Sequence, residues 1–277
     1  MRCRLLVGRD WTVPGEVNQG CLIGAGFGIT AGLPIACLCD LQALFPPTIK
    51  RNCQPVSQHL EVYIDYKSPY AFIAKDPTYA LEQDFDVDIQ WLPLTLNIGS
   101  YLGTAKVNNS GKVVDNQRSP RQWAAVKYAY MDARRYASLR GLTLRGTQKI
   151  WDSSLAAIGM LWAGKQHHDV LKSYTDIVYS RFWQRELDIE DPEVVTAVLA
   201  EAGADVLGFD AYRQGAGREY HDQLQDTILD RGYFGVPTYV IDGEVYFGRE
   251  HLPRVRWHLA GGKGPYPDIG NGTVLQP

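Results

Sequence analysis

The stretch 61–74, EVYIDYKSPYAFIA, constrains the fold more than any other part of this 277-residue chain. Its apolar residues alternate as in a strand up to Tyr66. Pro69 can then begin a helix, because the first helical turn does not need the N–H that proline lacks. Ser68 therefore lies at a predicted helix N-terminus, where free N–H groups and the helix dipole favour an anion such as a thiolate. A simple N-cap role explains the same serine, so both interpretations stay open.

The elements after residue 58 indicate one α/β unit. A helix from 69 to about 83 leads to a strand at 87–92, which predicts a parallel strand–helix–strand unit. Strands at 237–241 and 244–247 flank Asp242-Gly243, a strong hairpin signal, and a closing helix follows at 249–259. Between these halves, capping residues and apolar periodicity predict helices at 120–141, 152–163, 169–183, 191–202 and 217–231. The order predicts a thioredoxin-like sheet with an all-helical domain inserted at about 98–231.

Residues 1–57 form a leader of different composition. Residues 19–39 carry no charge and are long enough to cross a bilayer, but five glycines and Pro34 disfavour a helix. We expect a disordered or non-native leader, with a membrane or export segment and a folded cap as alternatives. The main domain is predicted at 58–261 and a C-terminal tail at 262–277. Membrane contact would come only through the leader, and a cytoplasmic location is expected.

All five cysteines precede residue 59, so the main domain contains no thiol. It can therefore neither exchange a dithiol for a disulfide nor use a cysteine nucleophile. The net charge of -3 argues against a nucleic-acid surface. No residue spacing typical of a metal site is present, so no metal is predicted.

Three motifs resemble those of the 2-hydroxychromene-2-carboxylate isomerase family, a sister of kappa-class glutathione transferases and of the DsbA group. They are DYKSPY at 65–70, FGVPT at 234–238 and FGRE at 247–250, supported by DIEDP at 188–192. The resemblance covers about 59–261 and implies a DsbA or kappa type of thioredoxin fold. Where the DsbA group has C-x-x-C, this chain has Ser-Pro-Tyr-Ala, which favours the branch that uses glutathione.

The resemblance implies a glutathione site. Ser68 resembles the residue that hydrogen-bonds the glutathione sulfur, and the backbone of Val236 would pair with the cysteinyl part. Pro237 resembles the cis-proline of thioredoxin folds, although a trans proline at a strand start is the simpler alternative. Glu250 stands where relatives usually have the aspartate that binds the γ-glutamyl amino group. The helix dipole alone also explains a carboxylate there.

The substrate side is less specific. The matching segments supply five candidate residues: Lys67, Asn97, Lys106, Asn108 and Trp183. Lys67 could instead be solvated, and Trp183 is more simply explained as a core residue. The implied activity is glutathione-dependent isomerisation of a small aromatic substrate, a ring-opened aryl pyruvate, by reversible thiolate addition. A kappa-like transferase or peroxidase, or a non-enzymatic binding module, is the alternative. A homodimer also stays open.

Overall fold

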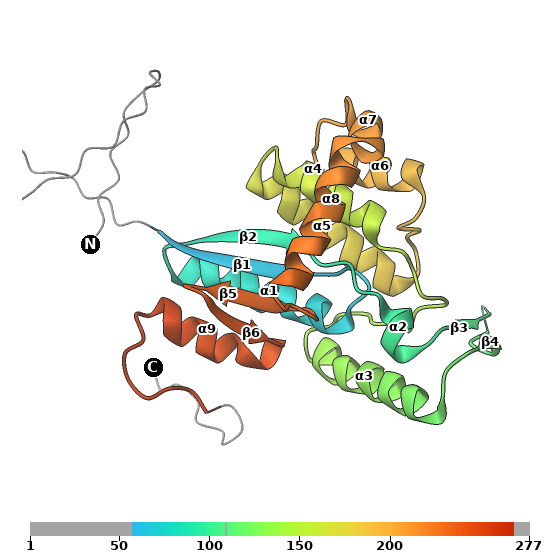
Figure 1. The fold of residues 1–277 in the computed structure, drawn as a ribbon, viewed down its shortest axis with the longest axis horizontal. Helices are drawn as coiled ribbons and strands as arrows, with labels where there is room; N and C mark the ends of the chain where they lie inside the picture. Colours follow the sequence, from blue (N-terminus) through green and yellow to red (C-terminus); the bar gives the residue numbers. More distant parts are fainter. Residues whose placement is uncertain (1–56, 109, 269–277) are drawn as a thin grey trace, which may run out of the picture. The chain divides into compact units, whose positions relative to one another are not determined.

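The computed structural model describes residues 57–108 and 110–268 (Figure 1). The predictions for the leader at 1–56 and for the end of the tail at 269–277 lie outside these residues. Within the described part, no helix has both the length and the apolar character needed to cross a bilayer.

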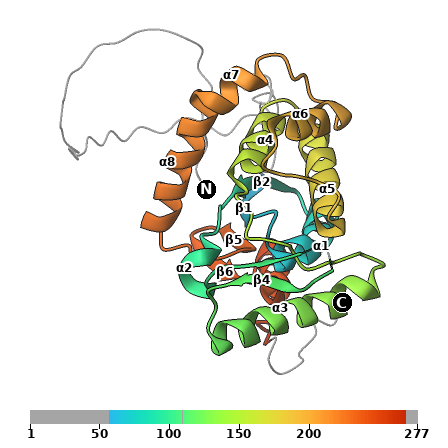
Figure 2. The same ribbon diagram turned by 90° about the vertical axis from the view of Figure 1, so that its right-hand side faces the viewer.

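Four strands form the central sheet: β1 (Gln58–Ile64), β2 (Val87–Pro93), β5 (Thr238–Ile241) and β6 (Glu244–Phe247). Their order is β2-β1-β5-β6, with β1 and β2 parallel and the other neighbours antiparallel (Figures 1 and 2). Strand β1 is internal, so its last three residues are all buried rather than alternating. The predicted strands and their thioredoxin-like order are confirmed.

Helices cover this sheet and fill the insertion. α1 (Pro69–Asp84) connects β1 to β2 and contacts α9 (Leu252–Leu259), which packs on β5. The inserted segment contains the remaining α-helices of the described part: α2 (Ile98–Leu102), α3 (Pro120–Leu139), α4 (Ser154–Gly164), α5 (His168–Gln184), α6 (Pro192–Glu201), α7 (Phe209–Gln214) and α8 (Ala216–Asp230). Helix α4 contacts β2, so the insertion packs directly on the sheet.

The starts of α3 and α6 follow the predicted capping signals. Ser119 and Gln122 form a complete capping box at the start of α3, just before Pro120. Asp191 caps α6 by accepting hydrogen bonds from Glu193 N at 2.8 Å and Val194 N at 3.4 Å. These local contacts satisfy N–H groups that have no partner inside the helix. They explain why α3 and α6 begin where the sequence predicts.

A proline inside α1 is compensated from α3. Pro77 has no N–H, so it cannot donate to the carbonyl oxygen of Ile73 one turn earlier. The guanidinium of Arg140, at the end of α3, donates to that oxygen instead. It also lies 3.8 Å from the carboxylate of Asp76. The hydrogen bond that α1 lacks at Pro77 is therefore replaced by a contact that joins α3 to α1.

The helical insertion predicted between the two halves is confirmed, but it is not wholly helical. β3 (Ala105–Val107) and β4 (Val113–Asn116) pair as an antiparallel hairpin. Every residue of β4 is exposed, so no alternation of apolar and polar residues could reveal the strand. The predicted closing helix also differs at its start, which is the separate 3₁₀ turn η1 (Arg249–His251).

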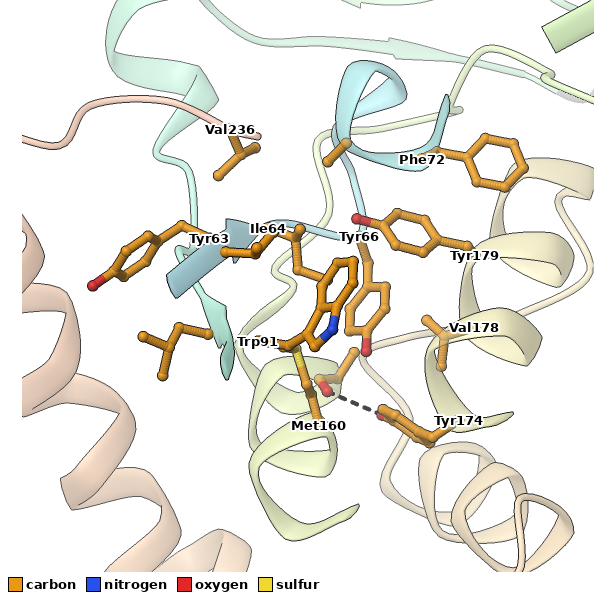
Figure 3. Close-up of a cluster of buried hydrophobic side chains, with 14 of the residues drawn as sticks. Tyr63, Ile64, Tyr66, Phe72, Trp91, Met160, Tyr174, Val178, Tyr179 and Val236 are labelled. Carbon is orange, nitrogen blue, oxygen red and sulfur yellow. Dashed lines mark hydrogen bonds between the residues drawn. The ribbon is translucent and has the colours of Figure 1, made fainter. Parts of the chain in front are cut away.

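One buried aromatic cluster joins the sheet to α5 (Figure 3). The ring of Tyr66 contacts the rings of Tyr179 and Tyr174 edge-on, at centroid distances of 4.9 and 6.1 Å. The hydroxyl of Tyr174 donates to the Ala156 carbonyl at 3.0 Å, and the hydroxyl of Tyr179 donates to the Asp65 carbonyl at 3.2 Å. Burial raises the pKa of both tyrosines far above the usual value. They therefore stay protonated and act as fixed donors.

We expect Gly159→Ala in α4 to lower the free energy of unfolding by about 1–3 kcal/mol. This is opposite to the gain of roughly 1 kcal/mol that alanine brings at an ordinary helix position. A Cβ at Gly159 would lie 2.3 Å from Tyr174 Oη and 3.2 Å from Val195 Cγ1. Tyr174 is fully buried and cannot move aside. Urea denaturation measures the change.

The matched control places the same substitution in a Tyr174→Phe background. Removing the hydroxyl removes the closest contact, so Gly159→Ala should cost less there. A stability gain in the wild-type background would contradict the packing argument.

Candidate active site

The turn between β1 and α1 positions Ser68. Its N–H donates to the Asp65 carbonyl at 3.0 Å, and its hydroxyl oxygen accepts from Ala71 N at 3.3 Å. Ser68 is thus the N-cap of α1, followed by Pro69 as the first helical residue. The predicted cap is confirmed. This first turn contains no acidic residue, so the positive end of the helix dipole is not neutralised locally.

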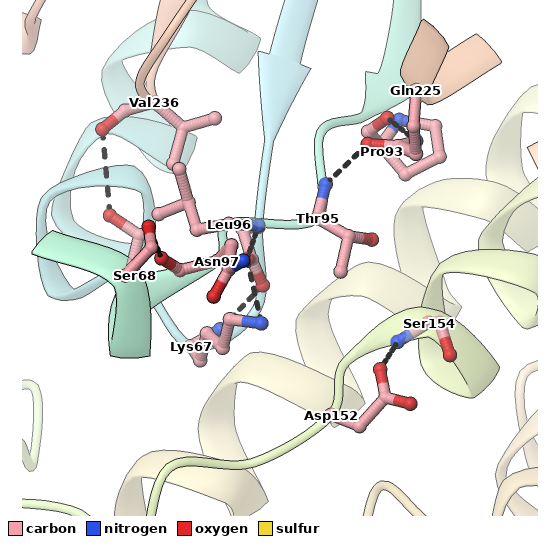
Figure 4. A network of polar contacts seen from close by, with 12 residues as sticks. Lys67, Ser68, Pro93, Thr95, Leu96, Asn97, Asp152, Ser154, Gln225 and Val236 are labelled. Atoms are coloured by element: carbon pink, nitrogen blue, oxygen red, sulfur yellow. Dashed lines mark hydrogen bonds and ion pairs between the residues drawn. The ribbon is translucent and has the colours of Figure 1, made fainter. Parts of the chain in front are cut away.

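The segment before β5 meets this turn. The peptide bond between Val236 and Pro237 is cis, as predicted. Ser68 Oγ donates to the Val236 carbonyl oxygen over 3.5 Å, a long hydrogen bond between buried residues (Figure 4). Two segments separated by 168 positions in the sequence are therefore adjacent. The hydroxyl proton of Ser68 is only weakly engaged and can turn to a better acceptor.

Lys67 belongs to a buried ion pair on the other side of the turn. Its Nζ lies 3.5 Å from Asp65 Oδ2, and both side chains are almost fully buried. Asp65 also accepts from the N–H groups of Lys67 at 3.1 Å and Leu96 at 2.8 Å (Figure 4). Burial by itself would raise the pKa of Asp152, but hydrogen bonds from Ser154 and the charge of Lys67 lower it below the usual value. Lys67 thus sits among carboxylates, not in open solvent.

Tyr70, the second residue of α1, lies next to this turn, but it is not a base. Its hydroxyl donates to Asp132 Oδ2 at 3.2 Å. Burial, together with the negative charge of Asp132, raises the pKa of Tyr70 to about 12. The phenol is therefore neutral near pH 7 and cannot serve as a phenolate base, and its proton is donated to Asp132.

Glu250 lies in the first turn of η1 and is exposed. Its carboxylate folds over Gly248, which has a φ of +104°. A Cβ on this glycine would lie only 2.5 Å from the carboxylate of Glu250. Within the described residues the carboxylate makes no hydrogen bond or ion pair, so it is available to a ligand amine. The guanidinium of the neighbouring Arg249 lies over the Tyr136 ring at 3.3 Å from its centroid.

A cavity of about 340 Å³ opens beside Lys67 and Pro69. Its walls come from α2, the β3–β4 hairpin, α3 and the loop at 146–151. None of the lining residues in the described part of the chain is acidic. The aromatic lining residues are Trp123, Tyr130 and Trp151, and the basic ones are Lys67, Arg118, Lys127, Arg134, Lys149 and Arg185. Aromatic walls with excess positive charge fit an unsaturated or aromatic anion.

The substrate-side candidates are not all brought together. Lys67 lines the cavity, and Asn97 is exposed at the start of α2. Lys106 lies between two residues of β3 that line the cavity, so its side chain points to the opposite face. Asn108 Oδ1 accepts from Ser110 Oγ at 2.7 Å and so supports the hairpin turn. Trp183 is fully buried against Phe72, 6.1 Å between ring centroids, as expected for a core residue.

Sequence reasoning missed the basic residues of α3 and its neighbours. Trp123, Lys127, Tyr130 and Arg134 follow each other at intervals of four, three and four positions, which places them on one helix face. A stripe that alternates basic and aromatic residues is not typical of a core. That stripe was the available signal, whereas Arg185 and Lys149 come from distant segments and gave none.

Comparisons with known proteins agree with this architecture. A family model described as DSBA-like thioredoxin domain matches residues 59–260. The 2-hydroxychromene-2-carboxylate isomerase of Pseudomonas putida is 24% identical over 196 residues, covering 70% of this chain and 90% of that protein. A solved 2-hydroxychromene-2-carboxylate isomerase is 22% identical, with a TM-score of 0.55 over 74% of this chain and 100% of that chain.

A second structural relative has another activity in its name. The probable DsbA oxidoreductase of Streptomyces coelicolor has a TM-score of 0.56 at 16% identity, over 76% of this chain and 93% of that chain. The structural matches therefore show the fold and do not separate isomerases from oxidoreductases. The resemblance to 2-hydroxychromene-2-carboxylate isomerases that the motifs indicated is confirmed as distant homology.

Proposed function

We propose that this chain, which belongs to the DSBA-like thioredoxin domain family, is a glutathione-dependent isomerase of the 2-hydroxychromene-2-carboxylate isomerase type. The observation that carries the proposal is the position of Ser68. It occupies the N-terminus of α1, in the Ser-Pro-Tyr-Ala segment that by resemblance corresponds to the C-x-x-C of the DsbA group, and it faces the carbonyl of Val236. From residue 59 to Pro277 the sequence has no cysteine, so this part of the chain supplies no thiol of its own, and a bound thiol would fill that role.

The residues present fit a thiolate ligand. The Ser68 hydroxyl can exchange its long contact to Val236 for a charge-assisted hydrogen bond to sulfur. The N–H groups of the first turn of α1 and the helix dipole add a favourable field. The main chain of Val236 would pair with the peptide part of the ligand, and the Glu250 carboxylate would bind its amino group. No acidic side chain in the first turn opposes a negative charge there.

Bound glutathione would supply the thiolate for reversible addition to the activated double bond of a ring-opened aryl pyruvate, which would permit isomerisation about that bond. The chain itself would lower the energy of the ionised sulfur through Ser68 and the helix end. The cavity beside Lys67 and Pro69 would hold the substrate, since its aromatic and basic lining suits an aromatic carboxylate. This arrangement supports an isomerase better than a dithiol oxidoreductase.

The direct test is to follow 2-hydroxychromene-2-carboxylate by ultraviolet absorbance with the full chain, with and without glutathione. We expect interconversion with its open-chain isomer only when glutathione is present, and glutathione recovered unchanged at the end. S-methylglutathione is the matched control, because it keeps the peptide groups but has no ionisable thiol. It should bind in calorimetry and inhibit.

Two outcomes would replace the proposal. A glutathione conjugate that accumulates would indicate a kappa-like transferase, and absence of glutathione binding would indicate a non-enzymatic module. Turnover that does not depend on glutathione would contradict the proposal that Ser68 stabilises a glutathione thiolate.

A further inference from the structure

Among the residues that the structure describes, four of the six basic side chains in the cavity wall have no carboxylate partner. Lys67 is paired with Asp65 and Lys149 with Glu190. In the part of the chain that the structure describes, Arg118, Lys127, Arg134 and Arg185 have no such partner. One carboxylate on a substrate would compensate only part of this charge. The excess needs an explanation of its own.

Two of these residues converge on Gly146. Arg185 Nε donates to the Gly146 carbonyl at 2.7 Å. From the other side, Arg134 Nη2 lies 3.5 Å from the position that a Cβ on Gly146 would take. Arg134 is itself fixed by an Nε contact of 2.9 Å to the Leu144 carbonyl and by the Tyr130 ring beneath it. Both guanidinium groups are thus held near one glycine through their Nε atoms. Their outer N–H groups point away from these contacts and can bind an anion.

A second group lies toward the start of α3. Arg118 donates from Nε to the Gly103 carbonyl at 3.3 Å and lies over the Trp123 ring at 5.0 Å from its centroid. Lys127, one turn further along α3, is exposed and makes no hydrogen bond to another described residue. Burial lowers the pKa of Arg118, yet an arginine remains charged near pH 7. Trp123 and Arg134 are 11 positions apart, or about 16 Å along the helix.

We propose that the ligand of this cavity carries two anionic groups, as in an aromatic or unsaturated dicarboxylate. One carboxylate binds Arg134 and Arg185 at Gly146, and the other binds Arg118 and Lys127. The unsaturated segment between them faces the part of the cavity that Lys67 and Pro69 line. This inference rests on the proposed function only in taking the cavity as the substrate side. It specifies that the preferred substrate is an aromatic or unsaturated acid with two carboxylates rather than one.

The test compares cinnamate with 4-carboxycinnamate, which differ by one carboxylate on the same ring. Calorimetric titration of the full chain at constant ionic strength is done with and without saturating glutathione. The dicarboxylate should bind at least about tenfold more tightly than cinnamate. Arg134→Gln and Arg185→Gln should each remove most of that preference, while cinnamate affinity changes less than about threefold. Thermal unfolding checks that the variants fold.

Lys127→Gln is a second test variant, and it should fold normally because Lys127 is exposed. It should also reduce the preference for the dicarboxylate. Arg135→Gln is the matched control on the same helix, because Arg135 pairs with Asp132 at 3.6 Å and does not line the cavity. It should leave both affinities unchanged. Equal affinity for the two acids, binding of neither, or a preference that survives the Arg134 and Arg185 substitutions would overturn the inference.

Glutathione affinity separates this inference from the proposed function. If the arginine variants lose glutathione binding and keep the dicarboxylate preference, the arginines serve glutathione and the inference is overturned. If the wild-type chain prefers the dicarboxylate but binds no glutathione, the inference stands and the proposed function fails.

Discussion

Ser68→Ala is expected to lower glutathione-dependent turnover near pH 7 by roughly ten- to a hundredfold. The substitution removes one hydrogen bond to the thiolate, worth about 1.5–3 kcal/mol, and leaves the N–H groups of α1 in place. The pKa of bound glutathione should rise, so less of it is ionised at neutral pH. Turnover should therefore fall more than glutathione affinity. Ultraviolet titration of the complex, in which thiolate absorbs and thiol does not, measures the effect directly.

The N-cap role of Ser68 needs its own control, because the hydroxyl also accepts from Ala71 N. Losing that cap should cost about 1 kcal/mol of folding stability. Asp191→Ala removes a comparable cap from α6, in the inserted helical segment. It should lower stability without changing the thiol titration. A Ser68→Ala protein that is less stable but titrates like the wild type would mean that the serine is only a cap.

Asp65→Asn is expected to have the largest effect on stability, lowering the free energy of unfolding by about 3–5 kcal/mol. The change leaves the charge of Lys67 buried without its partner, since the two side chains are 5% and 0% exposed. It also weakens the hydrogen bonds from the N–H groups of Lys67 and Leu96. Guanidinium denaturation with circular dichroism measures the change, because the loss is large enough to move the midpoint clearly.

The matched variant is Asp65→Asn combined with Lys67→Met, which removes the isolated charge. A buried pair usually costs little when both partners are replaced by neutral groups. We therefore expect the double variant to regain much of the lost stability. A double variant as unstable as Asp65→Asn alone would show that the pair is not the cause, and that the two N–H contacts of Asp65 dominate.

Local chemistry made much of the fold predictable. Ser119-Pro120 and Asp191-Pro192 start helices because the side chain satisfies N–H groups within three residues, which needs no distant partner. Asp242-Gly243 gives the hairpin of β5 and β6 for a similar reason, since Asp242 and Gly243 both have positive φ. The motif around Ser68 likewise predicted the strand, the turn and the cap. These features depend on neighbours in the sequence.

Only the tertiary structure decided which side chains share the site. The cavity collects Arg134 from α3, Arg185 from the end of α5 and Lys149 from a loop, and no local pattern links such distant positions. Strand pairing turned Lys106 away from the cavity, because side chains alternate between the two faces of β3. The sequence thus determined the turn that carries Ser68 and the lack of cysteine in the domain that contains it, from residue 59 onward. The position of charge around it followed from packing, because packing brings distant segments within the few ångströms over which charges act strongly.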